Sequence, residues 1–361
     1  MRAAQRLAVT AHRREIPAGD PRQLLDLRWS PDEAAFAADA MAAVLRDLCG
    51  HSASELAEAA RHYAVRDPFA AHRAAPVLSA HLGCPLTAEQ VTAGAGTTGL
   101  LQALAGLGRP GPVLHLAAFH PDLPLWARRL GATVAPCART PEEAVRLTAR
   151  HRPALVLIER PAVDGGFAAA DVLGRLAGTA AGSGGGLVVV DESYATYGGP
   201  GVSLAPLVAD HPNLVVLRGL SKGYCAGGLR VGFALAAPAT TERLRELAPP
   251  LAVNEVGLSL ALGLLARGDV FAPLRARIAA VRPRFISLLR DIGLVVREPD
   301  VPWLPWVVVP DGARARAALE RRDVLAKEVC TVPPAPALLR LSVPLSEERE
   351  CAVARALTAD G

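Results

Sequence analysis

Short apolar runs alternate with amphipathic segments along most of the chain. The runs are rich in valine, leucine and isoleucine and are short enough to be strands, whereas the segments between them repeat apolar residues at helical spacing. The predicted strands cover residues 111–117, 154–159, 186–191, 213–219 and 229–236. Strands that alternate with helices predict an α/β fold with a mainly parallel central sheet.

Three segments carry the signal of a helix start. Ser30 is followed by a proline and, three positions later, by Glu33, which matches a capping box ahead of an apolar helix. Similar patterns recur at Thr87 and Thr140. We therefore expect ordered structure from about residue 30, with a helix after each signal.

The pattern changes in the last third of the chain. Residues 255–290 are rich in Leu, Ala and Arg and predict a long helical stretch that connects two parts of the chain. Two apolar strands and two helices follow it, which predicts a second, smaller α+β domain. The segment SGGG at residues 183–186 is expected to be a surface loop between a helix and a strand.

Composition excludes several classes of protein. With 51% apolar and 20% charged residues in 361, the chain is expected to be a soluble globular protein of about two domains. The 39 basic and 35 acidic residues leave a net charge of +4, and no block of like charge suggests a nucleic-acid or membrane partner.

The cysteines and the N-terminus bear on location. The six cysteines form no CxxC pair and lie near no histidine cluster, so we expect neither a metal site nor a disulfide framework. The arginine-interrupted N-terminus is not typical of a signal peptide, and no apolar stretch is long enough to span a membrane. A reducing, cytoplasmic setting is the expectation.

Lysine is scarce in this chain. Only Lys222 and Lys327 are lysines among the 39 basic residues. Arginine suffices for a solvated positive charge, so a lysine here is expected to serve amine chemistry. Lys222 follows an apolar strand in a turn where Gly223, Gly227 and Gly228 leave room for a ligand. The alternative is an ordinary surface lysine.

Two further segments offer groups for a ligand. Asp191 ends the strand 186–191, where carboxylates of α/β proteins face the ligand crevice, although it could instead cap the next helix. Residues 91–107 read as strand, glycine-rich turn and helix. The backbone N–H groups and hydroxyls of this turn suit a phosphate, unless the glycines serve only the bend; the residues are Ala95, Gly96, Thr97 and Thr98.

These segments together resemble a known family. AGAGTTGLLQAL, VVVDESYATYGG, LRGLSKGYCAGGLRVGFALA and LLRLSVPL occur in that order from residue 93 onward. They resemble the fold type I pyridoxal-phosphate (PLP) enzymes of the aminotransferase class I/II superfamily, in the style of the histidinol-phosphate aminotransferase branch. The resemblance covers residue 55 to the end. It implies an N-terminal segment 1–45 associated with the small domain, a PLP-binding large domain 46–265 and a small domain 266–361.

The resemblance implies roles for the motif residues. Lys222 would be the Schiff-base lysine and proton shuttle, Asp191 the partner of the pyridine nitrogen, and Tyr194 a donor to the phenolic oxygen O3′. Ser221 and Arg230 would bind the phosphate together with the turn at residues 95–98. Arg340 would hold the α-carboxylate of an amino acid substrate.

Other positions follow from the same resemblance. Tyr63 would reach the PLP phosphate of a second subunit, which implies a homodimer with shared active sites. His120, or its neighbour Phe119, would stack on the cofactor ring, unless His120 is an ordinary residue at a helix entry. Asn254 would lie on the substrate side. Lys327 stands where a basic residue often precedes the carboxylate-binding arginine, but we interpret it as a surface lysine on a helix.

The chain departs from the family pattern at two points. Where relatives carry NPNNPTG, with an asparagine that contacts O3′, residues 159–166 read ERPAVDGG. Arg160 or Asp164 could enter that space, or the contact could be absent. Relatives usually carry a hydroxyl residue three positions before the lysine, whereas this chain has Gly219 there.

The expected function is that of a PLP-dependent enzyme acting on an α-amino acid, most simply an aminotransferase. The changed O3′ environment keeps other PLP chemistry open, such as that of an oxidase or hydroxylase, a decarboxylase or a cyclase. A catalytically idle PLP-fold binding protein is the second alternative. The sequence shows no phosphate pocket suited to histidinol phosphate itself.

Overall fold

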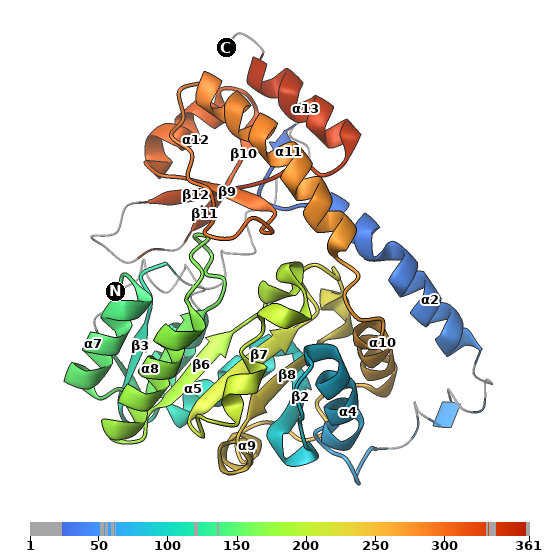
Figure 1. Ribbon diagram of the computed structural model, residues 1–361, viewed down its shortest axis with the longest axis vertical. Helices are drawn as coiled ribbons and strands as arrows, with labels where there is room; N and C mark the ends of the chain where they lie inside the picture. The colour runs from blue at the N-terminus through green and yellow to red at the C-terminus, as the bar shows by residue number, and fades with distance from the viewer. Residues whose placement is uncertain are drawn as a thin grey trace.

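A seven-stranded sheet forms the larger layer of the protein (Figure 1). The computed structural model describes residues 24–50, 54, 57–58, 61, 63–118, 122–135, 137–329, 331 and 337–358. The strand order is β2-β8-β7-β6-β5-β3-β4, and only β8 runs antiparallel to its neighbours. The strands are β2 (Val91–Ala95), β3 (Pro112–His115), β4 (Thr133–Val134), β5 (Leu155–Glu159), β6 (Leu187–Asp191), β7 (Leu214–Gly219) and β8 (Val231–Ala236). The predicted α/β fold with a mainly parallel sheet is confirmed.

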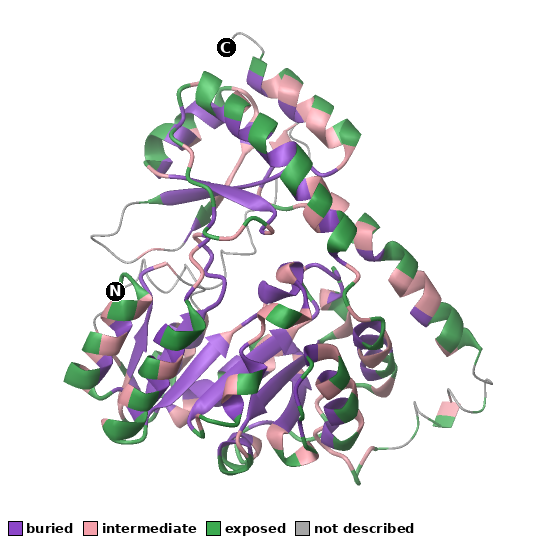
Figure 2. Ribbon diagram, in the orientation of Figure 1, coloured by how far each residue is buried: buried purple, intermediate pink, exposed green. Residues whose placement is uncertain are grey.

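Helices cover both faces of this sheet, whose strands are almost wholly buried (Figure 2). Alternate side chains of each strand enter different cores: Leu155 and Leu157 pack on one face, and Val156 and Ile158 on the other. The first face is covered by α5 (Gly96–Leu107), α6 (Asp122–Arg129) and α9 (Pro238–Arg245). The second is covered by α4 (Ala71–Leu82), α7 (Pro141–His151), α8 (Ala170–Gly182) and α10 (Glu255–Ala266).

A smaller α+β layer lies above the large sheet in Figure 1. Its antiparallel sheet has the order β11-β12-β9, with β9 (Trp306–Val309), β11 (Lys327–Val329) and β12 (Leu338–Ser342). The helices around it are α11 (Ala272–Asp291), α12 (Gly312–Glu320) and α13 (Glu347–Thr358). In addition, β1 (Leu25–Asp26) pairs with β10 (Val324–Leu325). The N-terminal segment thus packs with the C-terminal elements, while the predicted domain limits stay a prediction.

The helix start signals have different outcomes. At Thr140 the prediction is confirmed, because its hydroxyl accepts a hydrogen bond from the Glu143 N–H at 3.2 Å. The capping box predicted at Ser30 is wrong: the 3₁₀ helix η1 (Pro31–Ala37) has no side-chain cap, and α2 (Ala38–Cys49) continues from it. At Thr87 the box forms, but it closes only the 3₁₀ turn η2 (Ala88–Gln90) before β2 begins.

The long helical stretch predicted over residues 255–290 is helical but is divided into two helices. The chain forms α10 and α11 with a break between them. In that break Gly268 adopts a φ of +73°, and Pro273 lies in the first turn of α11. A left-handed glycine ends a helix and a proline begins one, so local backbone chemistry overrides the continuous apolar pattern.

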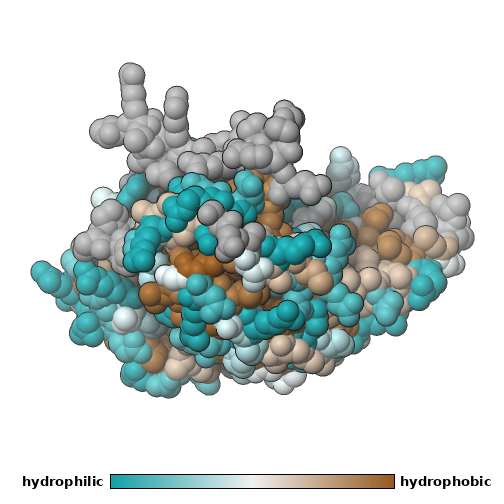
Figure 3. All heavy atoms as spheres, turned by 90° about the horizontal axis from the view of Figure 1, so that it is seen from above, coloured by the Kyte–Doolittle hydropathy of each residue, from teal (hydrophilic) through white to brown (hydrophobic). Residues whose placement is uncertain are grey.

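Figure 3 shows the molecule from above. The surface seen in this view is mostly hydrophilic, and hydrophobic residues gather near its middle. Among the helices that the structure describes, none combines the length and apolar character needed to cross a membrane.

Candidate active site

The carboxyl ends of the central strands bring the first candidate residues together. Asp191 ends β6 beside Glu159 of β5, with which it is in register. Strand alternation turns Asp191 toward the face covered by α5, because Val188 and Val190 enter the opposite core. Its Oδ1 accepts a hydrogen bond from the Ser193 N–H at 2.8 Å. The carboxylate is therefore fixed at the carboxyl end of the parallel strands, while its role toward a ligand stays a prediction.

The first turn of α5 forms a cradle against β8. Gly96 adopts a φ of +69°, and a Cβ there would lie 2.8 Å from Nη2 of Arg230. A Cβ on Gly232 would lie 2.5 Å from the Thr97 nitrogen. The Arg230 guanidinium donates to the Ala95 carbonyl at 3.2 Å. The two glycines thus allow an arginine to lie directly on the N-terminus of a helix, which favours an anion.

Gly219 explains one departure from the family pattern. A Cβ at this position would lie 3.0 Å from Cγ2 of Thr97. That distance is too short for most side chains unless the threonine moves. Thr97 therefore occupies the place where a hydroxyl residue at position 219 would project.

Lys222 lies between two aromatic rings. Its Nζ is 5.7 Å from the ring centre of Tyr194 and 5.4 Å from that of Trp29. The loop is held by a hydrogen bond from the Ala226 N–H to the Leu220 carbonyl at 3.0 Å. The amine is thus presented beside the tyrosine predicted to share its site.

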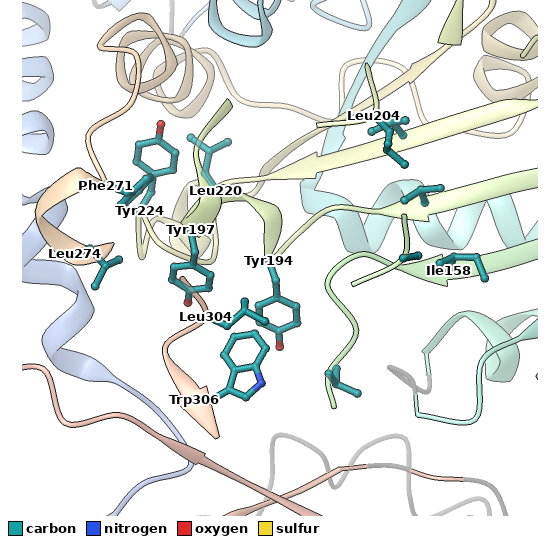
Figure 4. Close-up of a cluster of buried hydrophobic side chains, with 14 of the residues drawn as sticks. Ile158, Tyr194, Tyr197, Leu204, Leu220, Tyr224, Phe271, Leu274, Leu304 and Trp306 are labelled. Atoms are coloured by element: carbon teal, nitrogen blue, oxygen red, sulfur yellow. The ribbon is translucent and has the colours of Figure 1, made fainter. Parts of the chain in front are cut away.

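Tyr194 joins the two layers of the protein. It is buried, with its ring 4.9 Å from that of Trp306 in an edge-on arrangement, and both Tyr194 and Tyr197 project toward this indole (Figure 4). Its hydroxyl accepts a hydrogen bond from Nη1 of Arg340 at 3.1 Å. Arg340 is 5% exposed, and its Nε has no hydrogen-bond partner among the described residues. The predicted carboxylate-binding arginine is therefore buried and keeps donor capacity for a ligand.

Positive charge dominates the surroundings of Tyr194. Burial alone would raise its pKa, but the charges of Arg340, Lys222 and Lys327 outweigh burial and lower the pKa of Tyr194 to about 7. For Lys327, burial lowers the pKa to about 8, although Tyr194 acts in the opposite direction. The interpretation of Lys327 as a surface helix lysine is wrong, since it lies in β11 with its Nζ 4.4 Å from the Trp29 ring centre.

Sequence reasoning missed two residues of the N-terminal segment. Trp29 contacts both lysines, and Glu33 is buried where Tyr197 donates a hydrogen bond to its Oε2 at 2.6 Å. Burial raises the pKa of Glu33, while Tyr197, Arg340 and Lys222 oppose the shift. Glu33 was interpreted as part of a helix cap. Only the scarcity of aromatic residues and of lysine could have drawn attention to Trp29 and Lys327.

In the segment 159–166, Arg160 and Asp164 form their contacts with groups other than Tyr194. Arg160 donates to the carbonyls of Ala168 and Val202 and pairs with Glu192. Asp164 accepts from the Gly166 N–H and pairs with Arg297. These contacts therefore favour the third alternative for the missing asparagine, in which neither Arg160 nor Asp164 replaces it.

Two predicted residues line one cavity, whose lining does not include Lys222. Asn254 caps α10, its Oδ1 accepting from the Gly257 N–H at 2.6 Å. Together with Tyr63, which is 79% exposed, it lines a cavity of about 340 Å³ that also includes Arg73 and Glu255. Phe119 and His120 lie outside the described residues.

The comparisons with known proteins agree with this geometry. A protein-family model described as aminotransferase class I and II matches residues 62–357. The chain is 30% identical over 329 residues to a histidinol-phosphate aminotransferase of Thermobifida fusca, covering 88% of this chain and 86% of that one. It is 35% identical over 122 residues to an aromatic amino acid aminotransferase of Cutibacterium acnes, covering 33% and 35%.

Solved structures share the fold. The histidinol-phosphate aminotransferase of Sinorhizobium meliloti, solved in complex with pyridoxal-5'-phosphate, superposes with a TM-score of 0.71 at 22% identity, covering 88% of this chain and 86% of that one. N-Succinyldiaminopimelate aminotransferase of Mycobacterium tuberculosis gives a TM-score of 0.70 at 20% identity, covering 92% of each chain. The resemblance predicted from the motifs is confirmed.

Proposed function

The chain belongs to the aminotransferase class I and II family, and on that premise we propose that it is a PLP-dependent aminotransferase that uses Lys222 to process an α-amino acid. The observation that carries the proposal is that the Lys222 amine lies 5.7 Å from the ring centre of Tyr194, whose hydroxyl accepts a hydrogen bond from the buried Arg340. The cradle suits a cofactor phosphate, and Arg340 suits a substrate carboxylate.

The residues present fit PLP. The N-terminus of α5 and the Arg230 guanidinium provide donors for a phosphate. The hydroxyls of Thr97 and Thr98 belong to the first turn of α5, and Ser221 precedes Arg230 by nine residues. Asp191, at the end of β6, suits the pyridine nitrogen. The close approach of Arg230 to Gly96, where a Cβ would clash, is what an anion held by both backbone and guanidinium requires.

Each residue then has a task. When bound, PLP supplies an electron sink that weakens the bonds at the substrate's α-carbon. Asp191 keeps a proton on the ring nitrogen, and Lys222 holds the cofactor covalently and moves a proton at the α-carbon. Tyr194 holds a proton at O3′. Arg340 orients the substrate through its carboxylate.

We also propose that the enzyme is a homodimer with shared active sites. Tyr63, Leu251 and Val256 are exposed and line the same cavity, which leaves an apolar face typical of a protein interface. Tyr63 would reach the partner's cofactor phosphate from this face, and Asn254 stands at its edge. Mixing Lys222→Ala with Tyr63→Phe subunits should regain activity, because one site of each mixed dimer carries neither defect. No regain after verified subunit exchange would exclude this role of Tyr63.

The cysteines support a reducing compartment as the place of action. All five cysteines that the structure describes are free thiols. We therefore propose a cytoplasmic enzyme.

A panel of amino acids tests the proposed reaction. The relatives' names place histidinol phosphate and aromatic amino acids first on that panel. With PLP-loaded protein, we expect one amino acid to yield its oxo acid while the amino group stays on the cofactor and passes to an added oxo acid. Release of CO₂, uptake of O₂ or ring closure without amino transfer would instead identify another PLP reaction. Binding of PLP without conversion of any amino acid would indicate an idle protein.

A further inference from the structure

Lys327 lies directly opposite Arg340 in the small sheet. β11 and β12 are antiparallel and place the two residues in register. Residues in register on antiparallel strands project from the same face, so the amine and the guanidinium are neighbours. Arg340 in turn donates to the Tyr194 hydroxyl at 3.1 Å. Lys327 therefore belongs to the cationic surroundings of a buried phenol.

The choice of lysine at this position is informative. Of the 39 basic residues in the chain, only two are lysines, and both lie against the indole of Trp29. A guanidinium stays charged in proteins, whereas an amine can release its proton. In its charged form, either residue supplies the positive charge that acts on the Tyr194 phenolate.

Two polar side chains of the segment 159–166, Arg160 and Asp164, form their hydrogen bonds and ion pairs with groups other than Tyr194. Support for Tyr194 comes instead from the small domain, through Arg340 and Lys327. We propose that Lys327 is a positioning residue that, together with Arg340, sets the proton state of Tyr194.

This inference rests on the proposed function only in assigning Tyr194 to the cofactor's O3′. Near neutral pH, Tyr194 with a pKa of about 7 and Lys327 with a pKa of about 8 titrate over overlapping ranges, and the charge of each acts on the other. Loss of the proton from the Tyr194 oxygen leaves a phenolate that faces two cations. Other charges also act on this pair. Lys222 acts on both groups, Glu159 acts on Lys327, and Tyr197 with Glu33 adjoins Arg340 and Tyr194.

Ultraviolet titration of the full chain freed of cofactor tests the proposal. Burial raises the pKa of Tyr224 to about 12 and that of Tyr197 well above the usual value, so neither interferes near neutrality. Tyr194→Phe should remove the phenolate step near neutral pH and so assign it. Lys327→Met should move that step upward by about one pH unit, because an opposite charge is lost. Lys327→Arg should keep the step low.

Arg316→Met is the matched control. It also removes one cation beside β11, but Arg316 lies on α12 and pairs with the exposed Glu328, so the phenolate step should not move. If Lys327→Met does not fold, Lys327→Gln provides the same comparison. An unchanged titration in both neutral variants would overturn the proposal, as would a neutral step that persists in Tyr194→Phe.

A second readout follows if the enzyme turns over. In Lys327→Met, the limb of the kcat/KM profile that reports Tyr194 should move upward by the same interval as the titration, and in Lys327→Arg it should stay. A lower rate with an unmoved profile would contradict the positioning role. If no amino acid is converted at all, the proposed function fails, while the titration of the cofactor-free chain still decides the role of Lys327.

Discussion

The two halves of the proposed site, one for the cofactor and one for the substrate, are built differently. The cofactor half consists of strand ends and the turns that follow them in the large sheet, with Asp191, Lys222 and the first turn of α5. The substrate half is assembled from β11, β12 and the N-terminal segment, with Lys327, Arg340 and Trp29. Its members come from opposite ends of the chain.

This difference shows which functions a sequence displays locally. Phosphate and ring binding need several groups on one strand-turn-helix unit, so they leave compact motifs. Substrate recognition needs only that side chains converge, and tertiary packing can bring them from any position. We therefore expect changes in the cofactor half to abolish cofactor attachment or chemistry, and changes in the substrate half to weaken substrate binding while the cofactor stays attached.

The largest effect is expected at Lys222. Lys222→Ala removes the nucleophilic amine, so turnover should fall by about a thousandfold or more and no PLP should become covalently attached. Lys222→Arg keeps the charge without a nucleophilic amine and should fail equally. Borohydride reduction and mass measurement check both variants. Restoration by arginine would show that charge alone is required.

The next largest effect is expected at Asp191. Asp191→Ala removes the carboxylate that keeps the ring nitrogen protonated, and turnover should fall by about a hundredfold or more with PLP still attached. Thermal unfolding should change little, because among the described residues the carboxylate accepts a single hydrogen bond, from the Ser193 N–H. Unchanged kinetics in a folded variant would remove Asp191 from the site.

Arg340 tests the substrate half. Arg340→Met should lower kcat/KM by roughly thirtyfold or more, about 2 kcal/mol, mainly through KM, because a carboxylate loses a buried partner. Arg340→Lys should retain part of the binding, since it keeps charge without the bidentate geometry. Measured PLP content should stay normal in both variants. Loss of PLP without a change in KM would place Arg340 in the cofactor half.

The smallest effect is expected at Glu33. Glu33→Ala leaves the buried Tyr197 hydroxyl without its acceptor, so the free energy of unfolding should fall by about 1–3 kcal/mol. Glu33→Gln retains an acceptor and should cost less than the alanine variant. Chemical denaturation of both variants provides the comparison. Equal losses would mean that the carboxylate charge, rather than the hydrogen bond, matters at this position.

Much of the fold was predictable because the strands are short, apolar and separated by helical segments. The five predicted strands correspond to β3, β5, β6, β7 and β8. The break between α10 and α11 was missed because the apolar pattern of residues 255–290 outweighed the glycine and proline signals within it.

For the site, too, residues in local motifs were predicted and residues brought in by tertiary packing were missed. Asp191 and the α5 turn lie where local motifs placed them, whereas Glu33 was assigned to a helix cap and Lys327 to a surface helix. Both are drawn into the site by contacts between segments far apart in sequence, Glu33 with Tyr197 and Lys327 with Trp29. A pattern of neighbouring residues cannot encode such contacts.

Mapping the covalently bound cofactor tests the central claim most directly. Because the chain has only two lysines, reduction of the PLP-loaded protein with borohydride followed by peptide mass measurement has few outcomes. We predict that the cofactor is found on the peptide that contains Lys222. Cofactor on Lys327 instead, or on neither lysine in a protein that converts amino acids, would contradict the account.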